Sequence, residues 1–316
     1  MKLIITDSAT LTYNNDLSLD VFKSFGEVTA FPCIEKDELL ENVADKDIIL
    51  CNKTVIDAQV ISKAENLKLI GVFATGYNNI DLEAAKSRGI AVCNAGSYST
   101  EAVAQQVFAY ILMHYTRIDA YDSFVKDGGW KTSNTFSKFC FPTDELFGKS
   151  IGIIGYGSIG KKVSEIARVF GMKVYCHTRS KKQSDFVEFV SLDELLAVSD
   201  IVTVHCPLNE QSKGMFNAET FSKMKKGAYF INTARGGVLN EQALYDALSS
   251  GKLSGAAVDV LECEPMKSDC VLCDAPNITI TPHTCWAPLS TRKRLFEIVC
   301  ANIESFLNGG NQNRIV

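Results

Sequence analysis

Short apolar runs of four or five residues alternate along the chain with segments in which apolar residues recur every three or four positions. The short runs are typical of buried strands, and the longer segments are typical of amphipathic helices. Because parallel strands need a helix-length connection between them, this alternation predicts parallel sheets covered by helices. The strands predicted in the first part of the chain are 3–7, 28–31, 48–51, 69–73 and 91–94.

A second series of strands follows a long amphipathic segment at 99–126. It contains six predicted strands, the number of a full doubly wound dinucleotide-binding sheet. A last segment, 289–307, places Leu295, Val299 and Ile303 on one stripe and predicts a helix that returns to the first domain. The pattern therefore predicts two α/β domains. The six strands of the second series are 151–154, 173–177, 201–205, 228–232, 255–258 and 278–281.

A glycine-rich turn follows the first strand of the second series. Gly155 allows a tight turn, Gly157 lets the backbone approach a pyrophosphate, and Gly160 lets the following helix pack on the strand. The first N–H groups of that helix, predicted at 161–170, would face the anion. The alternative is a loop that is rich in glycine only for tight packing. The buried strand before the turn and the amphipathic helix after it favour dinucleotide binding.

Polar residues with catalytic potential lie at three predicted strand ends in the second half of the chain. Reduction of a 2-oxo acid by a nicotinamide hydride needs a bidentate cation, a proton donor and a group that keeps the donor protonated. Arg235, His283 and Glu264 have these chemistries. Each also has an ordinary interpretation, as a surface ion pair, a buried histidine bonded to backbone and a solvated loop residue, respectively.

Four runs in a fixed order give the chain a family resemblance. The glycine motif, INTARGG around Arg235, AAVDVLECEP with Asp259 and Glu264, and TPHTCW with His283 together resemble the D-2-hydroxyacid dehydrogenase family, over essentially the whole length. The resemblance implies an NAD(P)-dependent oxidoreductase that acts on the CH–OH group of 2-hydroxy acids. It also implies two doubly wound parallel-sheet domains. A Rossmann dinucleotide-binding domain at 99–287 would be inserted in a flavodoxin-like substrate domain at 1–98 and 288–316.

The same resemblance implies roles for individual residues. Arg235 would clamp the substrate carboxylate and carbonyl, His283 would give or take the proton, and Glu264 would hydrogen-bond His283 and favour its protonated form. Asp259 would face the nicotinamide carboxamide. The implied cofactor contacts are Val103, Gly155, Gly157, Ser158, Ile159, Gly160, Thr178, Arg179, Ser180, Cys206, Pro207, Thr233, Ala234, Arg235, Asp259 and His283, and the implied substrate contacts are Asn52, Lys53, Thr75, Gly76, Arg235, His283 and Trp286.

The second strand after the glycine motif bears on the choice of cofactor. NAD enzymes of this fold carry an acidic residue there, which bonds the ribose 2′-hydroxyl. In this chain the position holds Thr178, followed by Arg179 and Ser180. A guanidinium beside hydroxyls suits a 2′-phosphate, so the sequence predicts NADP over NAD. The alternative is that Arg179 stacks on adenine, which leaves NAD usable.

The choice of substrate depends on loops. Relatives that act on 3-phosphoglycerate have an extra arginine where this chain has Cys51, which disfavours a phosphorylated substrate. The loop at 52–54, the aromatic stretch 136–141 and Trp286 resemble glycerate dehydrogenases, also called hydroxypyruvate reductases, and favour hydroxypyruvate or glyoxylate. D-lactate-type and phosphoglycerate-type activities stay open, because the aromatic stretch would equally line an apolar pocket or a subunit contact. A nicotinamide-sensing corepressor that docks peptides is the competing function.

Net charge and chain length limit the classes of partner that we expect for this protein. The chain has 316 residues, 46% of them hydrophobic, and a net charge of −5, enough length for two domains with their own cores. Acidic and basic residues are interspersed, so we expect no nucleic-acid or membrane partner. Residues 1–7 are typical of a first strand rather than a signal peptide. The resemblance implies a homodimer formed through the second domain.

Eleven cysteines, an odd number, are typical of a reducing compartment and predict a cytoplasmic protein. Cys263, Cys270, Cys273 and Cys285 include one CxxC spacing, which zinc sites also use. Because only one close pair is present, we expect no metal.

Overall fold

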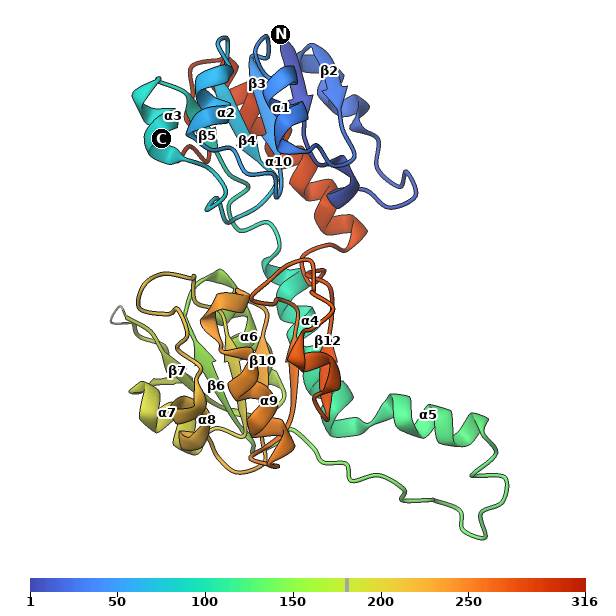
Figure 1. Cartoon of the computed structure of the whole chain (residues 1–316). Coiled ribbons are helices and arrows are strands. Elements are labelled where there is room, and N and C mark those ends of the chain that lie inside the picture. The colour runs from blue at the N-terminus through green and yellow to red at the C-terminus, as the bar shows by residue number, and fades with distance from the viewer. Residues whose placement is uncertain (180–181) are drawn as a thin grey trace. The chain divides into compact units, whose positions relative to one another are not determined.

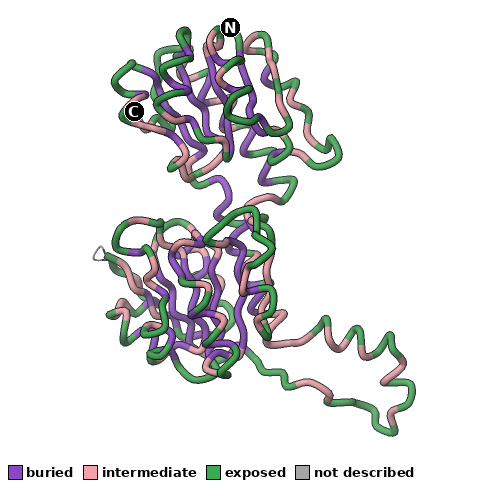
Figure 2. Tube along the Cα trace, in the orientation of Figure 1, coloured by how far each residue is buried: buried purple, intermediate pink, exposed green. Residues whose placement is uncertain are grey.

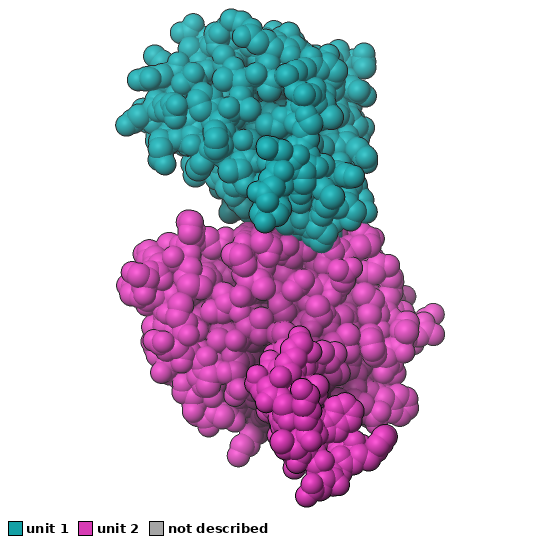
Figure 3. Space-filling model, turned by 90° about the vertical axis from the view of Figure 1, so that its right-hand side faces the viewer, with its two compact units in different colours: residues 1–99, 287–316 teal, residues 100–286 magenta. Residues whose placement is uncertain are grey.

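The computed structural model describes residues 1–179 and 182–316 and divides into two compact units. Unit 1 comprises Met1–Ser99 and Ala287–Val316, and unit 2 comprises Thr100–Trp286 (Figures 1 and 3). The last segment of the chain therefore returns to the unit that the first segment forms. Among the described helices, none combines the length and the apolar character needed to cross a membrane.

Unit 1 is built on a parallel sheet of five strands in the order β2-β1-β3-β4-β5, the order of flavodoxin-like sheets. The two neighbours β3 and β4 are buried along their whole length because helices cover both faces. The strands are β1 (Lys2–Ile5), β2 (Glu27–Ala30), β3 (Ile48–Cys51), β4 (Leu69–Val72) and β5 (Ala91–Cys93).

The helices of unit 1 divide between the two faces of its sheet. One face packs against α1 (Lys36–Asn42), α2 (Ala58–Lys63) and α3 (Leu82–Ser87), and shares a core with Ile49, Ile70 and Val92. The other face packs against α10 (Leu289–Leu307) and the short 3-10 helix η2 (Leu19–Phe25). There Phe22, Phe73 and Phe296 form a triangle with ring centroids 5.3–5.6 Å apart. A further 3-10 turn, η1, spans Ser8–Thr10.

Unit 2 is built on a parallel sheet of seven strands in the order β12-β11-β10-β9-β6-β7-β8. This is a doubly wound sheet, so the predicted fold class is confirmed. The prediction of six strands was wrong by one, because β8 has three residues and pairs only with β7 at the edge. The strands are β6 (Ser150–Ile154), β7 (Lys173–His177), β8 (Val187–Phe189), β9 (Ile201–Val204), β10 (Ala228–Asn232), β11 (Leu253–Val258) and β12 (Ile278–Ile280).

Helices also cover both faces of the second sheet. The helices α4 (Thr100–Thr116) and α6 (Ser158–Val169) share one core with the sheet. The opposite face packs against α7 (Leu192–Val198), α8 (Ala218–Lys223) and α9 (Glu241–Ser249). Two 3-10 turns, η3 (Gly236–Val238) and η4 (Val271–Asp274), follow β10 and precede β12.

The segment predicted as one helix at 99–126 is two helices. Arg117 has a φ of 54°, in the left-handed region that ends helices, and separates α4 from α5 (Ile118–Lys126). We call residues 118–143 the arm, because α5 and the loop after it extend away from the sheet of unit 2 (Figure 1). None of the α5 residues is buried (Figure 2). Phe136 and Phe139, in the loop of the arm, are 93% and 90% exposed.

Candidate active site

Three neighbouring strands of unit 2 bring the predicted catalytic segments to one edge of the sheet. The ends of β10, β11 and β12 are joined by backbone hydrogen bonds. The Asp259 N–H donates to the Asn232 carbonyl at 3.0 Å, and the His283 N–H donates to the Asp259 carbonyl at 2.8 Å. Segments more than 20 residues apart in sequence therefore meet where ligands bind in doubly wound folds.

His283 and Glu264 form a direct pair. Nδ1 of His283 lies 2.6 Å from Oε2 of Glu264, and the other oxygen of Glu264 accepts the Leu261 N–H at 3.0 Å. Because Nδ1 is held by the carboxylate, Nε2 is the ring nitrogen able to exchange a proton with a substrate. The His283 backbone has a φ of 54°, which is uncommon for a residue other than glycine, and its N–H bonds to Asp259 and Thr281 hold it there.

Arg235 lies on a turn that Asn232 shapes. The Asn232 side chain is fully buried, donates from Nδ2 to the Arg235 carbonyl at 2.9 Å and accepts the Ala234 N–H at 3.0 Å. Asn232 was not among the residues predicted for the site. The feature that could have indicated it is an amide side chain at the last position of a buried strand. One guanidinium nitrogen of Arg235 donates to the Ala234 carbonyl at 2.7 Å.

Gly236 brings the Arg235 turn against the Glu264 loop. A Cβ at Gly236 would lie 1.8 Å from the Leu261 carbonyl oxygen and 2.5 Å from the Glu262 nitrogen. Only glycine allows this contact between two backbones. Arg235 and Glu264 are therefore carried by touching segments.

Asp259 is a buried carboxylate that organises the segment after His283. It is 2% exposed and accepts hydrogen bonds from the Thr284 N–H at 2.9 Å, the Cys285 N–H at 3.0 Å and the Thr281 hydroxyl at 2.5 Å. These contacts fix the segment between His283 and Trp286. Its predicted contact with the nicotinamide carboxamide stays a prediction.

The glycine turn has the geometry of a dinucleotide cradle. A Cβ at Gly155 would lie 2.9 Å from the Cys206 nitrogen, and one at Gly160 would lie 2.1 Å from the Gly155 carbonyl oxygen, so both positions require glycine. A Cβ at Gly157 would meet no atom within 4 Å, so the space in front of the turn is open. Gly157 is also the N-cap of α6 and offers no side chain to the first N–H groups.

Two buried polar atoms near the cradle lack a partner. Among the described residues, Thr233 Oγ1 and His205 Nδ1 are buried without a hydrogen bond. Thr233 follows the end of β10, and His205 follows β9 directly before Cys206 and Pro207. Burial lowers the pKa of His205 to about 3, so its ring is neutral. Orphaned donors and acceptors beside an open turn fit a polar ligand, so these residues suit a bound dinucleotide.

The remaining predicted cofactor residues are placed around the same turn or on α4. Gly155 N–H donates to the His177 carbonyl at 2.9 Å, which sets Thr178 beside the turn. Arg179 is exposed, with a guanidinium nitrogen 3.4 Å from the Gln211 amide oxygen, and Ser180 lies outside the described residues. Ser158 and Ile159 begin α6, whereas Val103 is buried in the core between α4 and the sheet.

In unit 1, Asp7 holds the predicted substrate loop at 52–54. Its buried carboxylate accepts the N–H groups of Asn52 at 2.9 Å, Lys53 at 2.5 Å and Thr54 at 2.9 Å. Asn79 donates to the Thr54 carbonyl at 2.8 Å from the other side. Sequence reasoning missed Asp7, although a carboxylate at the end of the first predicted strand was a signal.

A relay of side-chain amides, of which Asn94 and Asn302 are buried, holds the Thr75 backbone. Asn94 donates to the Thr75 carbonyl at 2.7 Å, and Asn302 on α10 donates to the Asn94 carbonyl at 2.8 Å. Asn313 donates to the Asn302 side-chain oxygen at 2.9 Å. The relay fixes the strand-end loop that contains Thr75 and Gly76. It was not predicted, because it joins residues 208 positions apart.

The other histidines are engaged in packing. His114 stacks on Tyr229 with centroids 4.0 Å apart, and its Nε2 lies 3.0 Å from the Ser254 hydroxyl. Burial lowers the pKa of His114 to about 4. Nδ1 of His177 lies 3.2 Å from the Val190 carbonyl oxygen.

Comparisons with known proteins identify the family of the chain. A family model described as "D-isomer specific 2-hydroxyacid dehydrogenase, NAD binding domain" matches residues 108–285. The chain is 38% identical to the hydroxypyruvate reductase of Blautia hydrogenotrophica, with 99% of each chain covered, and 37% identical to the glycerate dehydrogenase of Methylorubrum extorquens, with 88% of each covered. The crystal structure of the TT0316 protein from Thermus thermophilus matches with a TM-score of 0.90 and 34% identity over 100% of both chains.

Proposed function

This chain belongs to the D-isomer specific 2-hydroxyacid dehydrogenases, oxidoreductases that act on the CH–OH group with NAD(P), and we propose that it reduces hydroxypyruvate or glyoxylate. The His283–Glu264 pair, on a loop that touches the Arg235 turn, is the observation that carries this proposal. The names of the two relatives above favour these substrates over lactate-type or phosphorylated ones.

Arg235, His283 and Glu264 have different roles in the proposed reduction. A bound reduced nicotinamide supplies the hydride. The Arg235 guanidinium pairs with the substrate carboxylate and polarises the adjacent carbonyl, because a planar cation binds both acceptors at once. Nε2 of protonated His283 donates its proton to the carbonyl oxygen, while Glu264 orients the ring and provides the opposite charge. In the direction of oxidation, the neutral ring takes the hydroxyl proton.

We assign the dinucleotide to unit 2 and the substrate loops to unit 1. The open glycine turn and the orphaned Thr233 hydroxyl support the first assignment. The loops at 52–54 and 75–76, held by Asp7 and by the amide relay, support the second. Rigid loops lower the entropic cost of ordering a small carboxylate.

We propose NADP as the preferred cofactor. Arg179 follows the end of β7, beside the glycine turn, and the acidic residue that would repel a 2′-phosphate is replaced by Thr178. The guanidinium is exposed, and its contact with the Gln211 amide oxygen is long, at 3.4 Å, which supports its being accessible to a phosphate.

We also propose a cytoplasmic homodimer. The eleven cysteines are all free thiols, as in proteins of reducing compartments. The arm exposes Phe136, Phe139 and Trp130, which favours burial against a second copy of this chain. Light scattering should give the mass of a dimer, and the double variant Phe136→Ser, Phe139→Ser should shift it toward a monomer; a parent protein that is monomeric at micromolar concentration would reject the dimer.

A substrate panel tests the proposed reaction. Hydroxypyruvate, glyoxylate, pyruvate, 3-phosphohydroxypyruvate and a bulky aromatic 2-oxo acid are each mixed with NADPH, and loss of reduced cofactor is followed by absorbance. We expect the highest kcat/KM for hydroxypyruvate or glyoxylate. A higher value for pyruvate, for the phosphorylated acid or for the aromatic acid would replace the proposed substrate, and no turnover of any acid would reject the proposed reaction.

A further inference from the structure

The CxxC motif at Cys270 and Cys273 has no part in the proposed reaction. Among the described residues, no group of three or more His, Cys, Asp or Glu side chains is placed to hold a metal ion. Cys285 was considered with these cysteines as a possible zinc ligand. It is buried, and its sulfur lies 3.4 Å from the Tyr110 hydroxyl. The CxxC thiols are therefore available for other chemistry.

The backbone holds the two thiols at disulfide spacing. Cys270 is the N-cap of η4, and the Cys273 N–H donates to the Cys270 carbonyl at 3.1 Å. Residues joined by such an i to i+3 hydrogen bond have Cα atoms less than about 7 Å apart, and disulfides need about 4.4–6.8 Å. Burial raises the pKa of the Cys270 thiol, and the negative charges of Glu241 and Cys273 raise it further.

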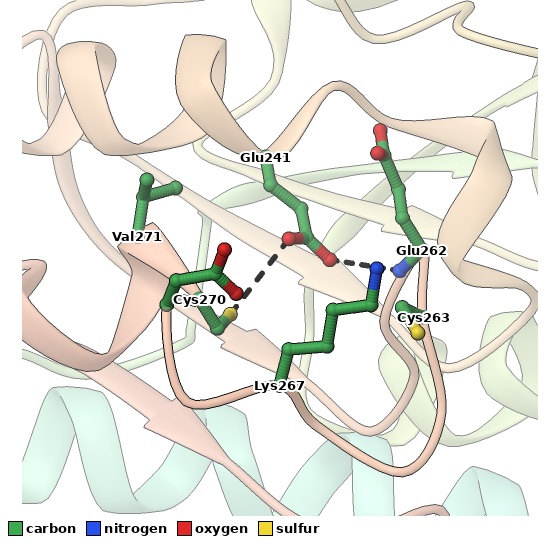
Figure 4. Close-up of a pocket in the computed structure, with 7 residues that line it drawn as sticks. Glu241, Glu262, Cys263, Lys267, Cys270 and Val271 are labelled. Atoms are coloured by element: carbon green, nitrogen blue, oxygen red, sulfur yellow. Dashed lines mark hydrogen bonds between the residues drawn. The ribbon is translucent and has the colours of Figure 1, made fainter.

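The thiols differ in access. Cys273 is exposed, and its sulfur lies 3.3 Å from the Met266 sulfur. Cys270 is half-buried and lines a cavity of about 230 Å³, together with Glu241, Glu262, Cys263 and Lys267. Figure 4 shows the Cys270 sulfur directed toward the Glu241 carboxylate, with Lys267 drawn between the sulfurs of Cys270 and Cys263. Cys273 is thus the thiol that a small oxidant reaches first, and Cys270, which the backbone hydrogen bond holds three residues away, is its candidate partner.

Glu241 connects this pair to the catalytic loop. One of its oxygens accepts the Glu262 N–H at 2.8 Å, and the other accepts the Cys270 S–H at 3.7 Å. Glu262 stands two residues before Glu264. A single carboxylate at the start of α9 therefore ties both ends of the loop that carries Glu264. A disulfide at Cys270 has no S–H, so oxidation removes one of these two ties.

We propose that Cys270 and Cys273 are a redox-active pair, which a peroxide converts into a disulfide that loosens the Glu264 loop and slows turnover. The effect on turnover rests on the proposed function, whereas the disulfide itself does not. Disulfides in reducing compartments are usually transient and redox-sensing, which suits a pair at the protein surface.

The steps balance with peroxide as the oxidant. The exposed Cys273 thiol gives up its proton, and its sulfur attacks one peroxide oxygen while the O–O bond breaks. Cys273 becomes a sulfenic acid, and the departing hydroxide takes the proton and leaves as water. The Cys270 sulfur then attacks the Cys273 sulfur, its proton passes through Glu241 to the departing hydroxide, and a second water leaves. Two thiols and one hydrogen peroxide thus yield one disulfide and two waters, and a dithiol reductant reverses the oxidation.

Peptide mapping by mass spectrometry tests the site without any substrate. The full chain is treated with equimolar hydrogen peroxide, alkylated and digested. We expect a Cys270–Cys273 disulfide, seen as the loss of two hydrogens from one peptide, which dithiothreitol removes. A disulfide that involves Cys263, or stable oxidation of Cys273 without a disulfide, would overturn the proposal.

Hydrogen exchange and turnover test the consequence. We expect oxidation to speed exchange of the Glu262 amide at least tenfold and to lower kcat at least threefold, with recovery in dithiothreitol. Cys273→Ser, which keeps the Cys270–Glu241 contact, should resist both effects, and Cys33→Ser, which removes an exposed thiol in unit 1, should respond like the parent. A disulfide that left exchange and kcat unchanged, or equal loss in Cys273→Ser, would overturn the switch. A parent protein without turnover before oxidation would reject the proposed function, and hydrogen exchange would still test whether the disulfide loosens the Glu264 loop.

Discussion

Glu264 and His283 are joined by a contact of 2.6 Å between a carboxylate oxygen and Nδ1, although 19 residues separate them in sequence. The contact fixes the orientation of the ring and selects the nitrogen that exchanges the proton. Because Leu261 and Gly236 tie the same loop to the Arg235 turn, the proton donor and the cation belong to one assembly within unit 2.

Replacing the charge of Glu264 tests this contact. Glu264→Gln keeps the size of the side chain and removes the negative charge opposite the protonated ring. We expect kcat for reduction at neutral pH to fall about 10²-fold, the lower part of the range for general acid catalysis, because the ring loses the charge that orients it. Steady-state kinetics at neutral pH measures this. Glu262→Gln, a neighbouring exposed carboxylate, serves as the control, and an unchanged kcat in Glu264→Gln would remove Glu264 from the proton step.

The cofactor preference is expected to follow Arg179. In Arg179→Asp, the ratio of kcat/KM for NADPH to that for NADH should fall about 10- to 100-fold, because a charge-assisted hydrogen bond contributes about 1.5–3 kcal/mol. Steady-state kinetics with both cofactors gives the ratio. Lys213→Asp, which makes the same charge change on an exposed position, should leave it unaltered. Equal or better use of NADH by the parent protein would contradict the preference for NADP.

Partly buried histidines make stability depend on pH. Burial lowers the pKa of His114 to about 4, below its usual value of 6.5, so the unfolded chain binds the proton more readily. Stability is fully present above pH 6.5 and is lost as the pH falls toward 4. We expect the free energy of unfolding to drop by about 1–2 kcal/mol between pH 7 and 5 from this group. Urea denaturation at both values measures it.

His114→Gln should remove this part of the pH dependence. His205, whose pKa burial lowers to about 3, would still contribute to the pH dependence in this variant. Its contribution extends the loss of stability to lower pH. His177→Gln is the control, because it makes the same substitution at another histidine of unit 2. His177 lies at the end of a strand and contacts a backbone carbonyl. The same drop between pH 7 and 5 in His114→Gln as in the parent would exclude His114 as its source.

The amide relay of unit 1 is expected to act on substrate affinity as well as stability. Asn302→Ala leaves the Asn94 carbonyl without its buried donor, which costs about 1–3 kcal/mol of stability. Because the relay ends at Thr75, KM for the oxo acid should rise more than kcat falls. Asn308→Ala, at the exposed end of the same helix, should change neither. A loss of stability with KM unchanged would confine Asn302 to a structural role.

Part of this fold could be predicted from the amino-acid sequence. Buried apolar runs such as Ile48–Cys51 indicate strands, and the glycine motif marks the turn after β6 because each glycine has a distinct steric reason. The strand β8 was missed, since three residues with an exposed Glu188 between Val187 and Phe189 give too weak a signal. The break at Arg117 was missed because its left-handed backbone carries no glycine to reveal it.

The sequence predicted the site residues that stand in motifs. It did not predict the residues that support the site through long-range hydrogen bonds. Arg235, Glu264 and His283 stand in runs that resemble a family, and the fold brings their segments to one sheet edge. Asp7 and Asn302 act through hydrogen bonds to residues 45 and 208 positions away. Neither periodicity nor local spacing contains that information, so only the folded chain shows how the substrate loops are held.

Chemical rescue at Arg235 tests the central claim most directly. The kcat/KM for hydroxypyruvate reduction is measured for the parent and for Arg235→Ala, with and without guanidinium ion, and Arg168→Ala serves as the control in unit 2. Loss of a charged bidentate contact of about 3–5 kcal/mol predicts a fall of about 10²–10³-fold or more, with partial recovery in guanidinium. Arg235→Ala with the kcat/KM of the parent would contradict the account.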